Sequence, residues 1–297
     1  MNLKTPYGQI VNANNIAEVI VNGERENLPP AHQDCIKRLL LVIDMQNDFM
    51  EGLGTLPVPG SKSDVERLNC WIYNHANKLT HILCSLDTHA AAQIFHPCWW
   101  KNRQGAQPSP FTIITHDDVL NGNWIPVNNE LGRTLEYLSN LETTGKKQLC
   151  IWPYHCLEGT FGANLESAFT RMLYFHAAAR HYTPTFITKG LNPWTEMYGI
   201  IRAEYDPQGF VNSAILDAME QADEVYIAGE ASSHCVLASV EQILAHFAHR
   251  PDVTNRIILL EDCMSPVTGF EETTNKAFAS MQELYGVRMV ISTETIP

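Results

Sequence analysis

Short apolar runs alternate along this chain with segments of helical periodicity. Six runs have the composition of strands that are buried on both faces, at residues 38–44, 81–87, 185–188, 224–229, 256–261 and 287–292. Between them, apolar residues recur at helical spacing in residues 63–79 (behind Ser63 as a cap), 212–222, 234–249 and 271–285. Strands that alternate with helices favour right-handed crossovers, so the pattern predicts an α/β fold with a parallel sheet covered on both faces.

Three segments interrupt this alternation. Residues 1–37 are polar and mixed in character, and we expect them to form an extension wrapped on the core. Residues 97–150 and 190–212 are rich in Pro, Gly, Asn and Trp, which favours loops over regular elements. We interpret both as insertions at the rim of the sheet. The prediction is one domain over residues 38–297, with an N-terminal extension and an insertion at about residues 97–150.

Composition narrows the class of protein. The 297 residues include 20 Lys and Arg against 33 Asp and Glu, a net charge of −13, which argues against non-specific binding to nucleic acid. No apolar run approaches the ~18 residues that span a bilayer, and the N-terminus lacks a signal-peptide core. The eight cysteines are too irregularly spaced for a disulfide framework. We therefore expect a cytoplasmic protein that binds neither nucleic acid nor membranes, and whose acidic surface and Trp-rich insertion allow a homo-oligomer.

Reactive side chains follow four of the predicted strands. In chain order they are Asp44, Asp87 with His89, Lys189, and Cys235. In a parallel α/β sheet, ligands bind beyond the carboxyl ends of the strands. Because four separate segments deliver such groups to one edge, we expect these side chains to form a single site.

The tripeptide Asp87-Thr88-His89 has the spacing of a metal-binding pair. In an extended segment, residues i and i+2 point to the same side, so this carboxylate and imidazole can converge on one ion. By itself, such a pair more often caps a loop through a hydrogen bond. His96 and His155 provide two further imidazoles, and this favours a metal site. Carboxylate and imidazole ligands suit zinc or another borderline divalent metal.

Cys235 follows a predicted strand at the turn into a predicted helix. The positive end of the helix dipole lowers the pKa of a thiol, and the N–H groups of a helix start can bind a developing oxyanion. A buried structural cysteine is the alternative, and it suits the cysteines inside or beside apolar runs better. A nucleophilic thiol also needs a proton acceptor and a nearby cation, for which Asp44 and Lys189 are the candidates.

Together these motifs resemble the nicotinamidases of the isochorismatase-like cysteine hydrolase superfamily. The resemblance rests on residues 42–49 (VIDMQNDF), 87–89 (DTH), 152–156 (WPYHC), 159–163 (GTFGA), 189–190 (KG) and 229–236 (GEASSHCV), which occur in the family's order. It covers roughly residues 38–292. The D-x-Q-x-D-F and W-P-x-H-C motifs are specific in combination, whereas a Lys-Gly pair alone carries no information.

The resemblance implies a three-layer α/β/α sandwich and a set of site residues. The implied catalytic triad is Cys235, Asp44 and Lys189. The implied oxyanion hole consists of the backbone amides of Ala231 and Cys235, next to a cis peptide bond between Glu230 and Ala231. The implied metal ligands are Asp87, His89, His155 and, as a further candidate, His96. By similarity, Phe49 and Trp152 pack against a flat aromatic ring of the substrate.

Three positions near the predicted nucleophile depart from the family's usual residues. Glu230, Ser232 and His234 stand where an aliphatic residue, Thr and an aromatic residue are usual. His234 can still stack on a substrate ring, but it adds a hydrogen-bonding edge. A carboxylate in the pocket would disfavour an anionic product, so we expect Glu230 to point away from the thiol, held by a partner outside the pocket.

The chemistry that these residues imply is hydrolysis of a small carboxamide. A metal-containing cysteine amidohydrolase that converts nicotinamide to nicotinate and ammonia through a Cys thioester is the first hypothesis. The alternative within the superfamily is an amidase for a different small amide, with a pocket remodelled by the insertion. Two further alternatives remain open: a metallohydrolase in which Cys235 is a bystander, and a binding or scaffold protein without activity.

Overall fold

The computed structural model describes residues 7–144 and 147–296. Its centre is a sheet of six described strands in the order β10-β9-β8-β1-β2-β7, and every neighbouring pair is parallel. The strands are β1 (Arg38–Ile43), β2 (His81–Asp87), β7 (Thr185–Lys189), β8 (Glu224–Gly229), β9 (Ile257–Leu260) and β10 (Arg288–Val290). All six residues of β1 are buried, as expected for a central strand of a parallel sheet. The predicted strands and their parallel pairing are confirmed.

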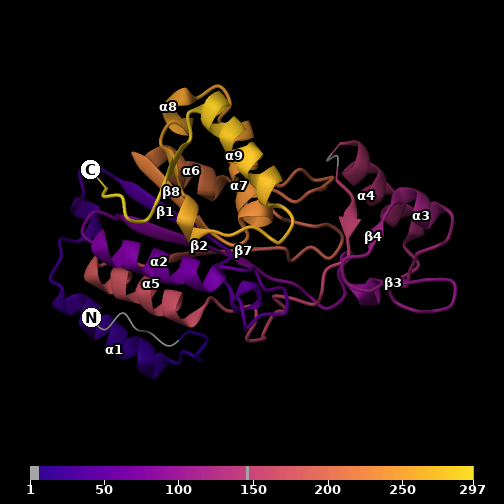
Figure 1. Ribbon diagram of the computed structural model, residues 1–297, viewed down its shortest axis with the longest axis horizontal. Coiled ribbons are helices and arrows are strands. Elements are labelled where there is room, and N and C mark those ends of the chain that lie inside the picture. Colours follow the sequence, from indigo (N-terminus) through magenta and orange to yellow (C-terminus); the bar gives the residue numbers. More distant parts are fainter. Residues whose placement is uncertain (1–6, 145–146, 297) are drawn as a thin grey trace.

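Helices cover both faces of this sheet (Figure 1). One face carries α2 (Ser61–Asn74) and α5 (Ser167–Ala179), and the other carries α6 (Ser213–Gln221), α7 (Leu237–His246), α8 (Pro251–Thr254) and α9 (Glu271–Tyr285). Separate apolar clusters fill the two spaces between sheet and helices. The predicted α/β/α sandwich is therefore confirmed. Across residues 7–144 and 147–296, none of the helices combines the length and the apolar character that crossing a bilayer requires.

The boundaries of two helices differ from the prediction. α2 begins directly after Gly60, so Ser63 lies inside its first turn instead of capping it. The helix ends at Asn74, and Leu79 lies beyond it in a turn that the apolar pattern alone does not distinguish from helix. The predicted helix at residues 234–249 is one turn of π-helix, η4 (Ser232–Val236), followed by α7. Such single π-turns are frequent at functional sites.

The described part of the N-terminal extension packs on the outside of α5. It contains α1 (Ala13–Arg25) and the short turn η1 (Ala31–Gln33). α1 crosses α5 closely, because a Cβ atom at Gly23 would lie 2.5 Å from the carbonyl oxygen of Phe175. The Ala31 N–H donates to the Arg180 carbonyl oxygen at 2.8 Å, which ties the extension to the end of α5. α1 was not predicted from the sequence, although about half of its residues are apolar.

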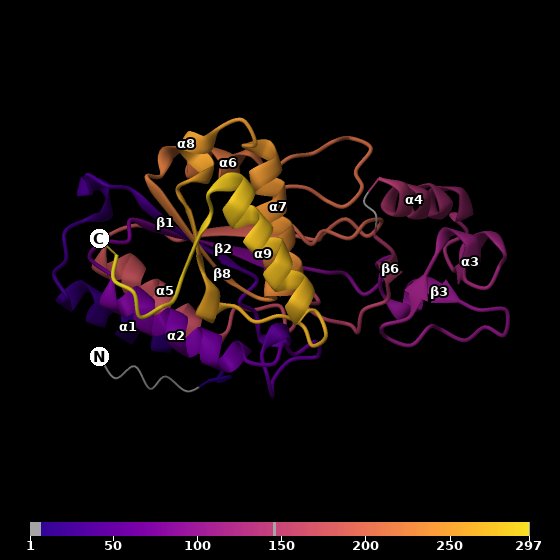
Figure 2. The same cartoon turned by 45° about the horizontal axis from the view of Figure 1, so that its top comes forward.

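Residues 97–144 and 147–150 belong to a lobe that projects from the carboxyl edge of the sheet, as Figure 2 shows. Its described elements are η3 (Pro97–Trp99), β3 (Trp100–Lys101), β4 (Ile113–Ile114), α3 (His116–Leu120), β5 (Ile125–Pro126), α4 (Leu131–Thr143) and β6 (Leu149–Cys150). A cluster of aromatic and aliphatic side chains, including Trp99, Trp100 and Tyr137, fills its interior. The lobe leaves the sheet after β2 and returns shortly before His155, which accounts for the long gap between the predicted metal ligands.

Candidate active site

Asp44, Lys189 and Cys235 meet at the carboxyl edge of the sheet. Asp44 follows β1, Lys189 ends β7, and Cys235 lies in η4 after β8. The Lys189 ammonium nitrogen lies 2.9 Å from Asp44 Oδ2 and 3.7 Å from the Cys235 sulfur. The Asp44 carboxyl group is also within hydrogen-bonding reach of the Cys235 thiol. The structure thus brings the three residues of the proposed triad into one buried cluster.

Burial dominates the electrostatics of this cluster. It raises the pKa of the Cys235 thiol well above its usual value, although the Lys189 charge acts in the opposite direction. The dipole-lowered thiol pKa that we expected from the sequence is therefore wrong, because loss of hydration outweighs the helix start. Burial also raises the pKa of Asp44, with the charge of Lys189 opposing it. A protonated thiol next to a carboxylate of raised pKa is the arrangement that a general base requires.

Lys189 stays charged in this buried position. Burial lowers its pKa, but the charges of Asp44 and Asp87 outweigh that effect and hold the pKa well above its ordinary value. The ammonium lies 2.9 Å from Asp87 Oδ1 and donates a hydrogen bond to the Met197 carbonyl oxygen at 3.0 Å. One lysine therefore forms ion pairs with two carboxyl groups at once.

Ser85 orients the Asp44 carboxylate, and sequence reasoning missed it. Its hydroxyl donates to Asp44 Oδ1 and accepts the Asp44 backbone N–H at 3.1 Å. Asp44 itself has a left-handed backbone conformation, with φ of +44°, which is uncommon for a residue other than glycine. The available signal was a serine in the middle of an otherwise apolar strand.

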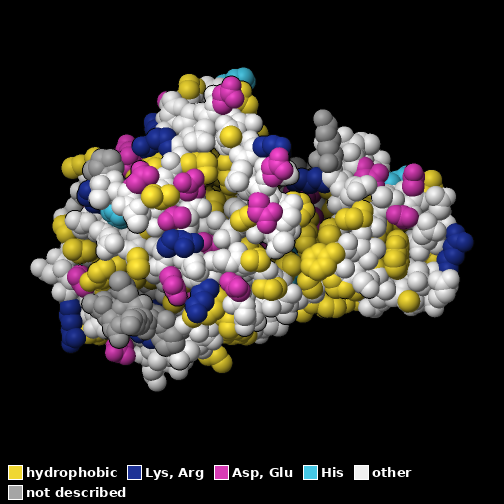
Figure 3. Space-filling model, viewed as in Figure 1, with side chains coloured by type: hydrophobic (Ala, Val, Ile, Leu, Met, Phe, Trp, Pro, Cys, Tyr) yellow, Lys and Arg dark blue, Asp and Glu magenta, His cyan; other side chains and the backbone are white. Residues whose placement is uncertain are grey.

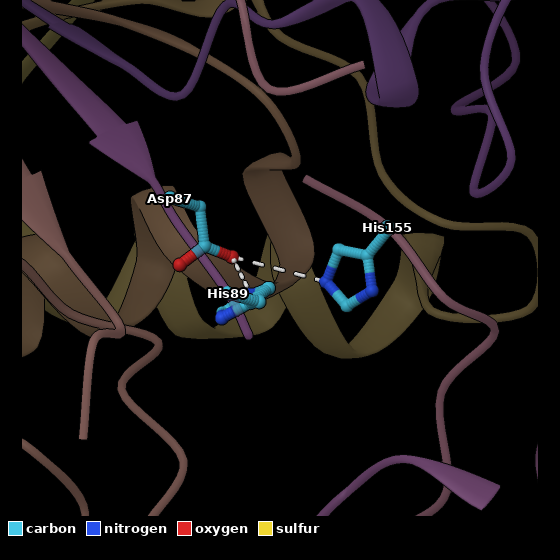
Figure 4. Close-up of side chains that lie close together, drawn as sticks. All are labelled: Asp87, His89 and His155. Carbon is cyan, nitrogen blue, oxygen red and sulfur yellow. Dashed lines mark hydrogen bonds and ion pairs between the residues drawn. The ribbon is translucent and has the colours of Figure 1, made fainter. Parts of the chain in front are cut away.

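Asp87, His89 and His155 form a group that can hold a metal ion (Figure 4). Their ligand atoms all lie within 4.8 Å of one another. Asp87 Oδ2 is 2.8 Å from His89 Nε2 and 3.8 Å from His155 Nε2, so the carboxylate faces both rings. Burial lowers the pKa of His155 to about 3, which keeps this imidazole neutral, as a ligand must be. The donor set fits zinc or a similar divalent metal.

Backbone carbonyls hold both imidazoles in place. His155 Nδ1 is 2.8 Å from the Pro153 oxygen, and His89 Nδ1 is 3.3 Å from the Gly190 oxygen. Such contacts fix the tautomer that leaves Nε2 free for a metal. Gly190 must lack a side chain, because a Cβ atom there would lie 2.6 Å from Asp87 Oδ1. This close approach explains the glycine of the Lys-Gly pair.

His96 lies beside this group without belonging to it. Its ring centre is 5.8 Å from those of His89 and His155, and its Nδ1 is 3.1 Å from the Ala91 carbonyl oxygen. Its buried Nε2 has no hydrogen-bond partner among the described residues. Burial lowers the pKa of His96 to about 4, so the ring is neutral. The structure therefore leaves His96 as a candidate ligand at the edge of the site.

A small pocket of about 40 Å³ opens directly onto the thiol. Its walls are Phe49, Leu56, Val58, Asp87, Trp152, His155, Glu196, Tyr198, Ala231, His234, Cys235 and Val267. The three residues proposed to contact substrate are among them: Phe49 packs edge-on against His155, and Trp152 packs edge-on against His234. Burial lowers the pKa of His234 to about 4, so a neutral ring lines the pocket.

Comparison with known proteins agrees with this fold. No protein-family model matches the sequence. A curated relative, the nicotinamidase of Saccharomyces cerevisiae, is 22% identical over 241 residues, which cover 80% of this chain and 93% of the relative. The solved structure of the yeast nicotinamidase bound to the inhibitor nicotinaldehyde has a TM-score of 0.58 at 19% identity, covering 86% of this chain and 99% of that chain. The pyrazinamidase of Pyrococcus horikoshii in complex with zinc has a TM-score of 0.50 at 21% identity, again covering 86% and 99%.

The chain has the isochorismatase-like fold. Within this fold, the polar residues of the first motif build the site without lining its pocket. Gln46 forms a pair of hydrogen bonds, both 2.7 Å long, with the backbone N–H and carbonyl of Asp87. Asp48 Oδ2 accepts the Cys156 N–H at 2.7 Å and so holds the loop that carries His155. These residues join the edge of the sheet that carries Asp44 to the group of Asp87, His89 and His155.

Two pocket residues of this isochorismatase-like chain were not found from the sequence. Glu196 and Tyr198 lie in the irregular segment at 190–212, a few residues after Lys189. Glu196 is buried, which raises its pKa well above the usual range, and one of its oxygens has no partner among the described residues. The Tyr198 hydroxyl accepts the indole N–H of Trp152 at 3.2 Å. The only available signal was their closeness in sequence to Lys189.

The backbone beside the nucleophile has the expected course. The peptide bond between Glu230 and Ala231 is cis, and the Glu230 side chain does not line the pocket. Its Oε2 accepts the Ser265 backbone N–H at 3.4 Å. Ala231 directly precedes the π-helical turn η4, Cys235 lies within that turn, and both residues line the pocket.

Proposed function

We propose that this protein is a metal-containing cysteine amidohydrolase that converts nicotinamide to nicotinate and ammonia. The observation that carries the proposal is the convergence, on one small pocket, of Cys235 with its buried Asp44 and Lys189 and of the Asp87, His89 and His155 group. Flat side chains at Phe49 and Trp152 form walls suited to an aromatic ring. The sequence relative and the solved structures described above, which are nicotinamidases and a pyrazinamidase, support the same chemistry.

The triad performs the reaction in two halves. Asp44 takes the thiol proton as Cys235 attacks the amide carbon, and the amides of Ala231 and Cys235 hydrogen-bond to the oxyanion. Protonated Asp44 then donates that proton to the departing nitrogen, which leaves as ammonia while a thioester remains. Asp44 next removes a proton from water, whose oxygen attacks the thioester carbon. The carbon–sulfur bond then breaks, Asp44 returns the proton to the sulfur, and the acid leaves as nicotinate after losing its own proton to solvent. Throughout, the Lys189 ammonium lies close to both the Asp44 carboxylate and the Cys235 sulfur and stabilises negative charge on either.

A divalent metal, with zinc as the candidate, fits the group Asp87, His89 and His155, and His96 is the candidate for a further ligand. When bound, such a metal would act as a Lewis acid that can accept an electron pair from the ring nitrogen of the substrate. The chain's own part is to hold the three ligands neutral or anionic and in fixed tautomers, as the carbonyls of Pro153 and Gly190 do.

A larger amide is the second candidate substrate, because a cavity of about 420 Å³ adjoins the catalytic pocket. The two spaces share Trp152, Glu196, Tyr198 and His234. The far wall comes from the lobe, including Ile113, Leu141 and Leu149. Figure 3 shows apolar side chains gathered at the junction between the lobe and the helical face that carries α9. A substrate with an apolar substituent on its acyl portion would occupy this cavity.

The test is ammonia release from a panel of carboxamides, with and without a chelator. We expect nicotinamide to be hydrolysed by the wild type and not by Cys235→Ala. Cys35→Ala, which removes an exposed cysteine, is the matched control and should retain wild-type rates. Undiminished activity of Cys235→Ala would support the metallohydrolase alternative. Turnover of larger amides alone would support the second candidate, and turnover of none would contradict both.

A further inference from the structure

Two carboxyl groups, those of Glu230 and Asp64, face each other behind the candidate oxyanion hole. Glu230 directly precedes Ala231, and Asp64 lies in the first turn of α2. Both residues are fully buried, and their carboxyl groups are within hydrogen-bonding reach of each other. Neither belongs to the described walls of the catalytic pocket, so the proposed reaction makes no direct use of them.

Two of the four carboxyl oxygens of the pair lack a hydrogen-bond donor in the described part of the chain when both groups are ionised. Glu230 Oε1 and Asp64 Oδ2 have no partner among the described residues. A buried carboxylate oxygen without a partner is costly, and two adjacent carboxylates cannot both ionise without strong repulsion. One proton held between the groups removes the repulsion and supplies the missing donor.

The charges around Glu230 and Asp64 also favour one protonated carboxyl group in the pair. Arg67 is the cation beside the pair, with its Nη2 2.5 Å from Asp64 Oδ1. Its Nε donates to the Asp262 backbone carbonyl, and the Asp262 carboxylate is itself bound at 2.7 Å by the N–H and the hydroxyl of Ser292. Two further groups interact with the pair, Tyr7 and Cys263, and burial raises the pKa of each, which keeps both neutral. Arg67 Nε also lies 3.9 Å from Asp262 Oδ2, so one cation faces three carboxyl groups, two of which are those of Glu230 and Asp64.

We propose that Glu230 and Asp64 share a single proton, with Glu230 as the neutral acid, and that this pair positions the backbone segment carrying the Ala231 amide. Glu230 is a positioning residue in this role, because its side chain touches neither the pocket nor the thiol. The inference rests on the proposed amide hydrolysis through Cys235.

A short series of hydrogen bonds connects the pair to the pocket. Glu230 Oε2 is 3.4 Å from the Ser265 N–H, and the Ser265 carbonyl accepts the Ser232 N–H at 2.8 Å. The next residue after Ser232 makes a second contact with the same loop: the Ser233 hydroxyl accepts the Val267 N–H at 2.9 Å, and Val267 lines the pocket. Moving the Glu230 carboxyl would therefore displace both the segment that follows it and the pocket wall at 265–267.

The protonation state follows from burial. Burial raises the pKa of Glu230 well above its ordinary value, and the charge of Asp64 raises it further. Burial also raises the pKa of Asp64, while hydrogen bonds from Ser265 and Glu230 and the neighbouring Arg67 oppose that rise. At neutral pH the proton accordingly stays on Glu230. Removing it in alkaline solution leaves two facing carboxylates beside one arginine and pushes the segment apart.

The decisive experiment compares the wild type with Glu230→Gln, Glu230→Leu and Asp64→Asn, using the amide that the panel shows to be hydrolysed fastest. Glu230→Gln keeps a neutral hydrogen-bond donor of the same shape, so it should retain kcat near pH 7 and lose the alkaline decline of the wild type. Asp64→Asn removes the charge that faces Glu230, so it should also reduce the decline of kcat at alkaline pH. Glu230→Leu removes the donor, and we expect kcat to fall by ~10-fold or more with little change in KM, because oxyanion contacts act in the transition state.

An infrared comparison tests the shared proton without any substrate. The wild type at neutral pH should show a carboxylic acid carbonyl band that Glu230→Gln lacks. Superimposable pH profiles of the wild type and Glu230→Gln, or no difference in that band, would overturn the proposal even if Glu230→Leu fails to fold. If the wild type hydrolyses no amide, the proposed function fails, and the infrared result alone then decides whether the pair shares a proton.

Discussion

The Lys189 ammonium lies 2.9 Å from the Asp87 carboxylate, and the two residues are register partners on the neighbouring strands β7 and β2. The same ammonium is 2.9 Å from Asp44, so one side chain joins the triad to the metal-binding group. All three groups are buried, and neither carboxylate has another cationic partner of comparable closeness among the described lysines and arginines. The stability of this edge and its chemistry therefore depend on the same lysine.

Replacing Lys189 with Met should abolish amide hydrolysis and destabilise the fold. Removal of one partner leaves buried carboxylates without a counter-charge, a loss of about 3–5 kcal/mol for buried ion pairs. Chemical denaturation of the wild type and the variant measures the free energy of unfolding. Lys276→Met is the control, because that lysine forms an exposed pair with Glu272 and should leave the unfolding midpoint unchanged. Equal destabilisation by both variants would contradict the bridging role of Lys189.

Metal content should depend on the three predicted ligands. We expect His89→Ala and His155→Ala to lose most bound divalent metal in elemental analysis, since each removes one of three donors. His96→Ala tests the further candidate: a partial loss of metal would assign its unpartnered Nε2 to the site. His246→Ala, at the end of α7, is the control and should retain the wild-type content. Equal metal in the wild type and His89→Ala would refute this assignment.

The ring nitrogen of the substrate should increase kcat/KM for amide hydrolysis. Nicotinamide and benzamide have nearly the same shape, but only nicotinamide can present a nitrogen to a metal held beside Phe49 and Trp152. We expect benzamide to have a clearly lower kcat/KM when ammonia release is measured for both. Equal rates would mean that the metal group does not bind the ring nitrogen.

A bulky residue at Ile113 should distinguish the two candidate substrates. Ile113 is partly exposed and lines the 420 Å³ cavity but not the catalytic pocket. Ile113→Trp should lower kcat/KM for amides with large apolar substituents and leave that for nicotinamide within about twofold, as expected for a surface change away from the reacting atoms. Ile113→Val, which keeps the cavity open, is the matched control. If Ile113→Trp affects both substrates equally, the cavity is not a separate part of the binding site.

The buried acid at Glu230 should make stability depend on pH. Because burial raises its pKa in the folded state, the folded protein binds more protons than the unfolded chain above the ordinary Glu pKa of about 4.3. Protonated Glu230 contributes its full stabilisation below that pH. The free energy of unfolding then decreases as pH rises toward the raised pKa of the folded state, by up to about 1.4 kcal/mol per pH unit. The midpoint temperature of thermal unfolding, measured as pH rises through this range, should fall less steeply for Glu230→Gln than for the wild type. Parallel curves would show that Glu230 is ionised in the folded protein.

The parallel sheet and the residues at its carboxyl edge could be predicted because their signals are local. An apolar run that ends in an acid identifies β2 to the residue, from His81 to Asp87. Strand ends in a parallel sheet meet at one edge, so Asp44, Lys189 and Cys235 could be expected together before any distance was known.

Other features had no local signal. Glu196 and Tyr198 reach the pocket from an irregular loop, whose path depends on packing against the lobe and not on periodicity. The direction of the Cys235 pKa shift was predicted wrongly, because a helix dipole can be inferred from neighbouring residues whereas the loss of hydration depends on everything packed around the thiol.

By itself, the sequence determined the order of the six strands along the chain, the alternation with helices that makes the sheet parallel, and the set of reactive groups at its edge, but α1 and α5 were not predicted. Only the tertiary structure decided which of these groups touch: that Lys189 bridges Asp44 and Asp87, that His96 lies outside the group of three ligands, and that Glu230 faces Asp64. The physical reason is that periodicity and strand ends depend on neighbours along the chain. Charge pairing and hydration depend instead on segments that only folding brings together, such as α2 and the end of β8.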